Sequence, residues 1–141
     1  MRTNTQFPMA FHAMMMIANF KDTRMTSEMV ARSVGCNAVT IRNIFGKLKR
    51  AGLLSVKTGT GGTSLARPAE EITLWDIYSA VETDSAEEIF KIHENASQLC
   101  PVGRRVRGML TPCFENIVTA MQAELSCVTL AQMLEDLDTS K

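Results

Sequence analysis

Four side chains close together in the sequence are of the types that read base edges in duplex DNA. They are Val39, Thr40, Arg42 and Asn43. Arginine pairs two donors with guanine, asparagine matches adenine, and the methyl groups of valine and threonine pack on the methyl group of thymine. On the exposed side of one helix these residues would project into a major groove. The segment therefore predicts sequence-specific contacts with DNA.

Other residues nearby are suited to the sugar–phosphate backbone. Backbone amides and hydroxyls of Thr26 and Ser27, at the start of a helix, could hold phosphates, and Lys47 and Lys57 add positive charge. Asn37 is predicted to cap the helix that carries the reading residues. A glycine-rich turn would let a loop approach the duplex closely. The predicted DNA-binding set is Thr26, Ser27, Asn37, Val39, Thr40, Arg42, Asn43, Lys47, Lys57, Thr58, Gly61 and Gly62.

Two of the four cysteines stand where a helix is expected to begin, which favours the thiolate. Cys100 directly precedes the first residue of a long helix, and Cys36 lies at the start of the reading helix. The long helix then carries Arg104, Arg105 and Arg107, whose positive charges are expected to stabilise the Cys100 thiolate and lower its pKa. We expect Cys100 to be a redox-sensing thiol for oxidants or electrophiles, with Cys36 of the partner subunit as its resolving thiol. The alternative is that both are small buried residues without a switching role. Of the other two thiols, Cys113 is expected to pack, and Cys127 gives no signal.

These side chains need a scaffold, and the hydrophobic pattern predicts one. The expected elements are helices over 7–20, 26–34 and 38–50, then strands over 53–56 and 64–66 joined by the turn at 59–62. Thr26 or Ser27 is expected to cap the second helix, and Gly35 to end it. In the third helix the inward-facing residues are expected to be Ile41, Ile44, Phe45 and Leu48. Two helices in a tight turn followed by a hairpin make a winged helix-turn-helix.

Further helices are predicted downstream. A capping box of Thr73 and Asp76 would begin one helix, and another of Thr129 and Gln132 the last. Between them we expect a turn of helix within 84–90, a loop over 91–99 and a long helix over about 101–125. The fold class is therefore mostly α with a small β-hairpin. A winged helix-turn-helix DNA-binding domain would occupy residues 1–80, and a dimerisation and sensing region with a long C-terminal dimerisation helix residues 81–141.

The long helix carries an apolar stripe. Its members are Val106, Leu110, Cys113, Ile117, Ala120 and Met121. A lone helix cannot bury such a stripe inside so small a chain, so a twofold homodimer is expected. The alternative is that the stripe packs only on its own domain. Pro112 lacks a backbone donor and should kink the helix or split it near Leu110.

Charge is distributed unevenly although the formal net charge is zero. Residues 1–67 hold ten lysines and arginines against two acids, and residues 68–141 hold five against thirteen. A basic half suits a polyanionic partner. No apolar run is long enough to span a bilayer and no secretory signal opens the sequence, so a cytoplasmic protein without membrane contacts is expected. Without a Ser/His/Asp set or a phosphate-binding loop, an enzyme is not expected.

Taken in series, short motifs along nearly the whole chain resemble the Rrf2 family of bacterial winged-helix regulators, which includes IscR, NsrR and CymR. The motifs are Gly35-Cys36-Asn37, the run from Ile41 to Leu54, the glycine-rich wing, Ile72-Thr73-Leu74, Cys100-Pro101-Val102-Gly103 and Val128-Thr129-Leu130. The resemblance implies a homodimer that pairs through the long helix. It also implies that this dimer binds a dyad-symmetric operator in double-stranded DNA.

Two positions depart from what the resemblance implies. Many members place an arginine just before the first glycine of the wing, where this chain has Thr58, so the wing is expected to clamp the DNA backbone. Several members bind an iron–sulfur cluster through three cysteines before the long helix. Here only Cys100 matches, with Gly103 where a non-cysteine ligand can lie. One thiolate cannot hold a cluster that needs about four ligands. The chain thus resembles the cluster-free, YwnA-like branch, and no cofactor is expected.

Three functions are compatible with these observations. The first is a dimeric, sequence-specific DNA-binding transcriptional repressor that thiol oxidation or electrophile modification releases from DNA. The second is a repressor that responds to a non-covalent small-molecule effector. The third is a winged-helix protein-interaction adaptor whose basic face binds an acidic partner. Retention on duplex DNA carrying its own promoter would separate the repressors from the adaptor.

Overall fold

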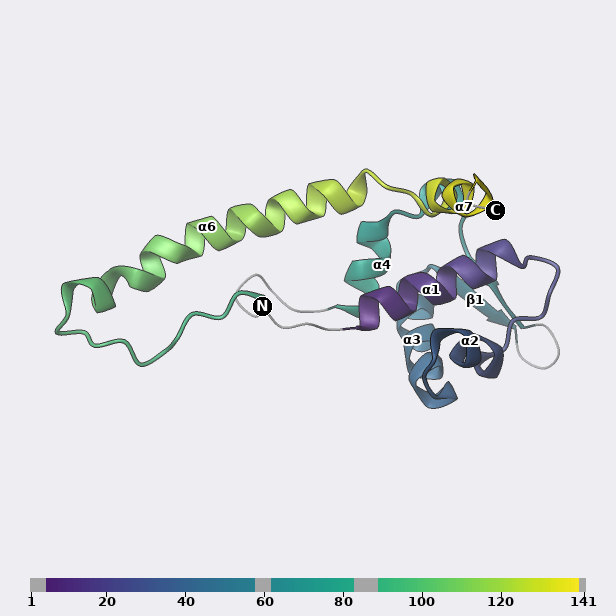
Figure 1. Cartoon of the computed structure of the whole chain (residues 1–141), viewed down its shortest axis with the longest axis horizontal. Helices are drawn as coiled ribbons and strands as arrows, with labels where there is room; N and C mark the ends of the chain where they lie inside the picture. Colours follow the sequence, from purple (N-terminus) through teal and green to yellow (C-terminus); the bar gives the residue numbers. More distant parts are fainter. Residues whose placement is uncertain (1–4, 58–61, 83–88, 140–141) are drawn as a thin grey trace.

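Helices dominate the computed structural model, which describes residues 5–57, 62–82 and 89–139. The elements in chain order are α1 (Gln6–Asn19), α2 (Ser27–Val34), α3 (Ala38–Arg50), β1 (Leu54–Lys57), β2 (Gly62–Leu65), η1 (Ala69–Glu71), α4 (Leu74–Val81), α6 (Pro101–Ser126) and α7 (Leu130–Thr139). β1 and β2 pair antiparallel, from Leu54 opposite Leu65 to Lys57 opposite Gly62. Figure 1 shows a body of short helices and this hairpin, from which α6 extends away. The predicted fold class is confirmed.

Local capping interactions set the limits of α2 and α3. Thr26 Oγ1 accepts a hydrogen bond of 3.2 Å from the backbone N–H of Met29, so Thr26 rather than Ser27 caps α2. Gly35 ends that helix in the left-handed region, at φ 88°. Asn37 then caps α3, because its Oδ1 accepts from the N–H of Thr40 at 2.8 Å. These three predictions are confirmed.

The core of the body is apolar and lies between α1, α2, α3 and α4. The inward face predicted for α3 is confirmed, since its buried residues are Ile41, Ile44, Phe45 and Leu48. The largest fully buried side chains elsewhere include Met14, Leu53, Ile72 and Ile77. Each such side chain contributes roughly 1.5–3 kcal/mol when it is removed from water. The reading helix is therefore held rigidly by its buried side.

The last helix of the chain returns to this body. Thr73 and Thr129 form an isolated antiparallel bridge, and Leu130, next in the chain, is fully buried in the core. From there α7 packs against α1 and η1. Both predicted capping boxes are present, that of Thr73 with Asp76 and that of Thr129 with Gln132. The end of the chain thus completes the core that its first half builds.

α6 is a single helix of 26 residues that runs unbroken past Pro112. Of the two outcomes predicted for Pro112, a kink or a split near Leu110, the split does not occur. None of its residues is buried, and its contacts with the body are made mainly with α4. Within the predicted stripe, Val106, Leu110 and Met121 are half-buried, whereas Cys113, Ile117 and Ala120 are exposed. The chain itself therefore covers the stripe only in part.

The segment before α6 matches its prediction only in part. Residues 91–99 form no helix or strand, as expected, and most of the helical turn predicted within 84–90 lies outside the described residues. Phe90 stacks on Phe114, with ring centroids 5.0 Å apart. This contact holds the loop alongside α6.

Candidate nucleic-acid interface

The exposed face of α3 carries the predicted reading residues. Val39 is 57% exposed, and Arg42 and Asn43 are also exposed, whereas Thr40 is half-buried. Asn37 Oδ1 accepts hydrogen bonds from both the backbone N–H and the hydroxyl of Thr40, at 2.8 and 3.0 Å. Asn37 and the Thr40 hydroxyl therefore serve the helix start. Among the predicted polar reading residues, Arg42 and Asn43 are the two whose side chains take no part in capping α3.

Arg42 has a partner that the sequence did not indicate. Its Nη1 lies 3.1 Å from Oε1 of Glu28 in the first turn of α2. The pKa of the Glu28 carboxyl is lowered, first by a hydrogen bond from its own backbone N–H and further by Ser27 and Arg42. Glu28 is thus ionised at neutral pH. An acid in the first turn of a helix is a signal for helix stabilisation, so nothing in the sequence alone linked it to an arginine in the next helix.

A groove of about 480 Å³ lies between the start of α2, α3 and the base of the hairpin. Among the described residues that line it, the charged ones are Arg24, Glu28, Arg42, Lys49 and Lys57. Thr26 and Ser27, predicted to hold phosphates, line it as well. The groove thus gathers positive charge and hydroxyl donors beside the reading face, as a phosphate backbone requires.

Gly62 brings the hairpin close to the loop before α2. Its φ is +70°, in the left-handed region, and a Cβ there would lie 2.8 Å from Cγ of Arg24. Only glycine fits this approach without displacing Arg24. The sequence predicted Gly62 to be part of the turn, but it is the first residue of β2. Thr58 and Gly61, also predicted to contact DNA, lie outside the described residues.

Lys47 and Lys49 point to different surroundings. Lys47 is half-buried, and its Nζ donates to Oε1 of Gln6 in α1 at 2.7 Å. Lys49, which was not in the predicted set, lines the groove. The spacing of lysines on an amphipathic helix shows which ones face outward, but not which outward direction meets the groove.

Cys100 is exposed and occupies the N-cap position of α6, as predicted. Hydrogen bonds from the backbone N–H groups of Gly103 and then Val102 lower the pKa of its thiol. The predicted effect of the three arginines is not among the causes of this shift. A Cβ on Gly103 would collide with the carbonyl oxygen of Ser97. Glycine at this position therefore lets the preceding loop fold over the helix start.

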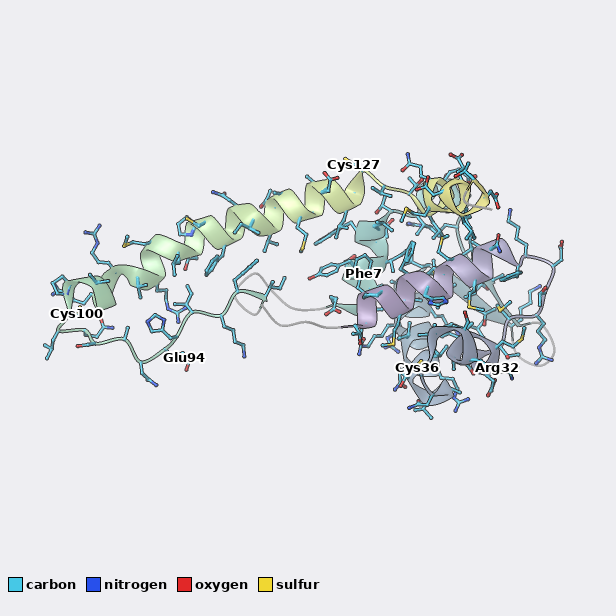
Figure 2. The ribbon with its side chains drawn as sticks, viewed as in Figure 1. Phe7, Arg32, Cys36, Glu94, Cys100 and Cys127 are labelled. Atoms are coloured by element: carbon cyan, nitrogen blue, oxygen red, sulfur yellow. The ribbon has the colours of Figure 1, made fainter. Side chains whose placement is uncertain are left out.

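Cys36 is half-buried and lies in the body, whereas Cys100 lies at the far end of α6 (Figure 2). The two thiols of one chain cannot meet in this arrangement. Among the described residues, no three His, Cys, Asp or Glu side chains are grouped to hold a metal ion.

Two further observations bear on the class of protein. Among the described residues, none of the helices combines the length and the apolar character that crossing a bilayer requires. A family model described as Rrf2, iron-dependent transcriptional regulator, matches residues 3–136.

Individual relatives agree with this match. YwnA of Bacillus subtilis (strain 168), which carries a provisional assignment as an HTH-type transcriptional regulator, is 34% identical over 134 residues, or 95% of this chain and 98% of YwnA. A crystal structure assigned provisionally to a transcriptional regulator from Lactobacillus plantarum has a TM-score of 0.79 at 25% identity, covering 95% of this chain and 90% of that one. IscR of T. potens, at 21% identity, has a TM-score of 0.73 and covers 100% of this chain and 91% of its own. The last comparison shows the shared fold alone.

Proposed function

The chain belongs to the Rrf2 family of transcriptional regulators, and on that premise we propose that it is a dimeric repressor of a dyad-symmetric DNA operator. In this proposal α3 enters the major groove of the DNA, and the β1–β2 hairpin lies along the sugar–phosphate backbone. The protein acts in the cytoplasm without a cofactor or a catalytic step, and its output is the occupancy of a promoter.

One observation carries the DNA-binding part. The groove that four basic side chains line adjoins the exposed face of α3, where Val39, Arg42 and Asn43 are free of the core. Arg24, Lys49 and Lys57 come from a loop, a helix and a strand, and only the fold brings them together. A basic groove beside a polar reading face suits a duplex, in which phosphates flank the base edges.

The dimer part is supported by α6. A helix of 26 residues with none buried is not expected to be stable in water unless something covers its apolar side. Leu99, Val102, Met109 and Ile117, on this helix or just before it, are exposed apolar residues. A second copy related by a twofold axis covers such a surface on both chains at once.

The regulatory part is supported by Cys100. An exposed thiol with a lowered pKa is a nucleophile toward oxidants and electrophiles. In the proposed switch, Cys100 and Cys36 of the partner subunit form a disulfide, and two electrons and two protons pass to an oxidant such as a quinone. The bond would tie the reading helix of one subunit to the dimerisation helix of the other and change the spacing of the two reading helices.

The DNA-binding part is tested by the affinity of the full-length protein for duplex fragments of its own promoter region. We expect binding that weakens steeply with salt, because phosphate contacts release counterions. Arg42→Ala should lose preference for the operator over random duplex DNA. Lys57→Ala should weaken binding to the operator and to random duplex DNA alike, and should reduce the number of ions released on binding by about one. Equal affinity for all duplexes, or none for any, would contradict the proposal.

The switch is tested separately. Diamide or a quinone should lower the operator affinity of the wild type and leave that of Cys100→Ser unchanged. Unaltered affinity of the oxidised wild type would contradict the thiol switch and leave the repressor proposal standing, with a non-covalent effector as the alternative signal.

A further inference from the structure

A small network on the groove surface links the reading helix to the helix before it. Nη1 of Arg42 donates to Oε1 of Glu28 at 3.1 Å and to Oγ of Ser27 at 3.4 Å. The Ser27 hydroxyl donates in turn to Oε2 of Glu28 at 3.2 Å. Two side chains of α2, Ser27 and Glu28, therefore hold one nitrogen of the Arg42 guanidinium.

This network contributes little to holding the fold together. The side chains of Arg42 and Glu28 are 54% and 60% exposed, and ion pairs that exposed contribute little to stability. The buried residues of α2 and α3 already pack the two helices against each other. The ion pair therefore affects mainly where the Arg42 side chain lies.

The guanidinium keeps one edge available. Arginine presents five N–H donors in a rigid fork, and both partners of Arg42 use Nη1. Within the described chain, no hydrogen bond is made by its Nε or Nη2. Two adjacent donors on one edge match the O6 and N7 acceptors of guanine.

An arginine beside DNA has two competing uses. A freely rotating side chain can pair with a phosphate at any sequence, whereas a side chain held with one edge forward meets the base edges. Holding it also removes in advance part of the rotamer entropy that readout would cost. Glu28 repels phosphates and attracts Arg42, so it favours the second use.

We propose that Glu28 is a positioning residue that orients Arg42 for guanine readout and thereby sets operator specificity without touching DNA. The inference rests on the proposed DNA-binding function. It adds a residue of α2, outside the reading helix, to those that determine which base is preferred.

The test selects bound duplexes from a random library with full-length wild type, Glu28→Ala, Arg42→Ala and the double variant. The wild type should enrich a motif containing a guanine for which Arg42→Ala loses its preference, roughly tenfold. Glu28→Ala should reduce the preference for guanine about threefold at that same base pair and at no other, because it weakens the contact that Arg42 makes there. Its affinity for non-specific duplex should stay the same or rise, because a negative charge leaves the groove. The double variant should reproduce the Arg42→Ala profile.

Two control variants separate positioning from structure. Glu70→Ala removes the same side chain from an exposed turn outside the groove and should keep the wild-type profile. Glu28→Gln keeps an acceptor for Nη1 and should lose less than Glu28→Ala. Glu28 also lies in the first turn of α2, where an acid favours the helix. A purely structural role would lower the affinity for all sequences evenly and leave the base preference unchanged.

The outcomes distinguish the two proposals. If the wild type selects a motif and Glu28→Ala selects the same motif with the same base preferences, this inference alone is overturned. A wild-type selection without any enriched motif overturns the proposed function and this inference with it.

Discussion

Asn37, which caps α3, and Asn43, in the middle of that helix, have different surroundings, although both are polar and exposed. Asn37 directs its carbonyl oxygen to two donors of Thr40. The side chain of Asn43 makes no hydrogen bond within the described chain and lies next to Arg42 on the exposed face of α3. One residue type therefore serves folding at one position and is available for recognition at the other.

This difference predicts opposite responses to alanine. Asn37→Ala should lower the free energy of unfolding by about 1 kcal/mol, because an N-cap is lost. The midpoint of thermal unfolding, followed by circular dichroism, should fall by a few degrees. Asn43→Ala should change stability by less than about 0.5 kcal/mol and alter the preferred base in a DNA-binding assay. The reverse pattern would show that the roles are misassigned.

The lowered pKa of Cys100 has a measurable consequence. A thiol whose pKa is lowered in the folded protein remains a thiolate to lower pH than an ordinary cysteine. Its alkylation by iodoacetamide should therefore reach half of its maximum rate at a pH below that of a cysteine in a model peptide. Peptide mass spectrometry would measure the rate, with exposed Cys127 at the other end of α6 as reference. Urea should abolish the difference, and equal rates in the folded protein would contradict the shift.

Sequence reasoning succeeded at the residue scale wherever an interaction is local. The caps Thr26, Gly35 and Asn37 act within one turn of helix, so neighbouring residue types determine them. The pairs Glu28 with Arg42 and Gln6 with Lys47 span 14 and 41 positions. Which of many exposed charges meet across such separations depends on the packing of whole helices, and no spacing rule contains that information.

At the scale of elements, Gly62 fixes how the hairpin meets α2. Both its positive φ and the contact with Arg24 exclude other residues. Gly35 is a matched comparison, because its φ is +88° but nothing lies within 4 Å of its absent Cβ. The two glycines therefore separate backbone strain from crowding.

Gly35→Ala should lower the free energy of unfolding by about 1–2 kcal/mol through backbone strain alone. Gly62→Ala should cost more, because it adds a collision. Arg24→Ala, combined with each, should reduce the cost of Gly62→Ala and leave that of Gly35→Ala unchanged. Denaturant titrations of the two glycine variants, Arg24→Ala alone and the two double variants would measure this coupling. Additive effects in both pairs would show that Arg24 does not limit the hairpin.

At Pro112 the structure excludes one of the two predicted outcomes, the split of the helix. A proline inside a helix lacks the N–H that would bond the carbonyl of Gly108, four residues earlier. The helix nevertheless continues. Thr111 Oγ1 donates to the carbonyl oxygen of the neighbouring Arg107 at 2.7 Å. Because α6 is not enclosed by the body, it also has room to adjust, and the sequence pattern did not reveal that.

At the scale of the whole molecule, α6 predicts the assembly. Ile117 and Met109 are 48% and 63% exposed and lie near one side of the helix. Ile117→Asp and Met109→Asp should convert a dimer into a monomer at micromolar concentration, because a charge would be buried against apolar residues. Multi-angle light scattering would measure the mass. Gln122→Asp, about 140° around the helix from Ile117, should remain dimeric, and a monomeric wild type would refute the assembly.

The predicted division of the chain at residue 80 did not include how its two parts connect. The long helix and the winged helix each follow from a local pattern of apolar residues. Leu130, in contrast, is fully buried in a core built mainly from residues before 82. An apolar residue at the start of a short helix does not reveal which core it enters, because that depends on the direction in which α6 leads the chain.

If the proposed dimer forms through the unburied α6, DNA binding depends steeply on the concentration of the protein. If two chains must associate before α6 is covered, the concentration of the DNA-binding species rises with the square of the monomer concentration whenever dimers are scarce. Halving synthesis would then reduce operator occupancy by more than half. A promoter that this protein regulates would respond more steeply to its expression level than one controlled by a monomer, before any chemical signal acts.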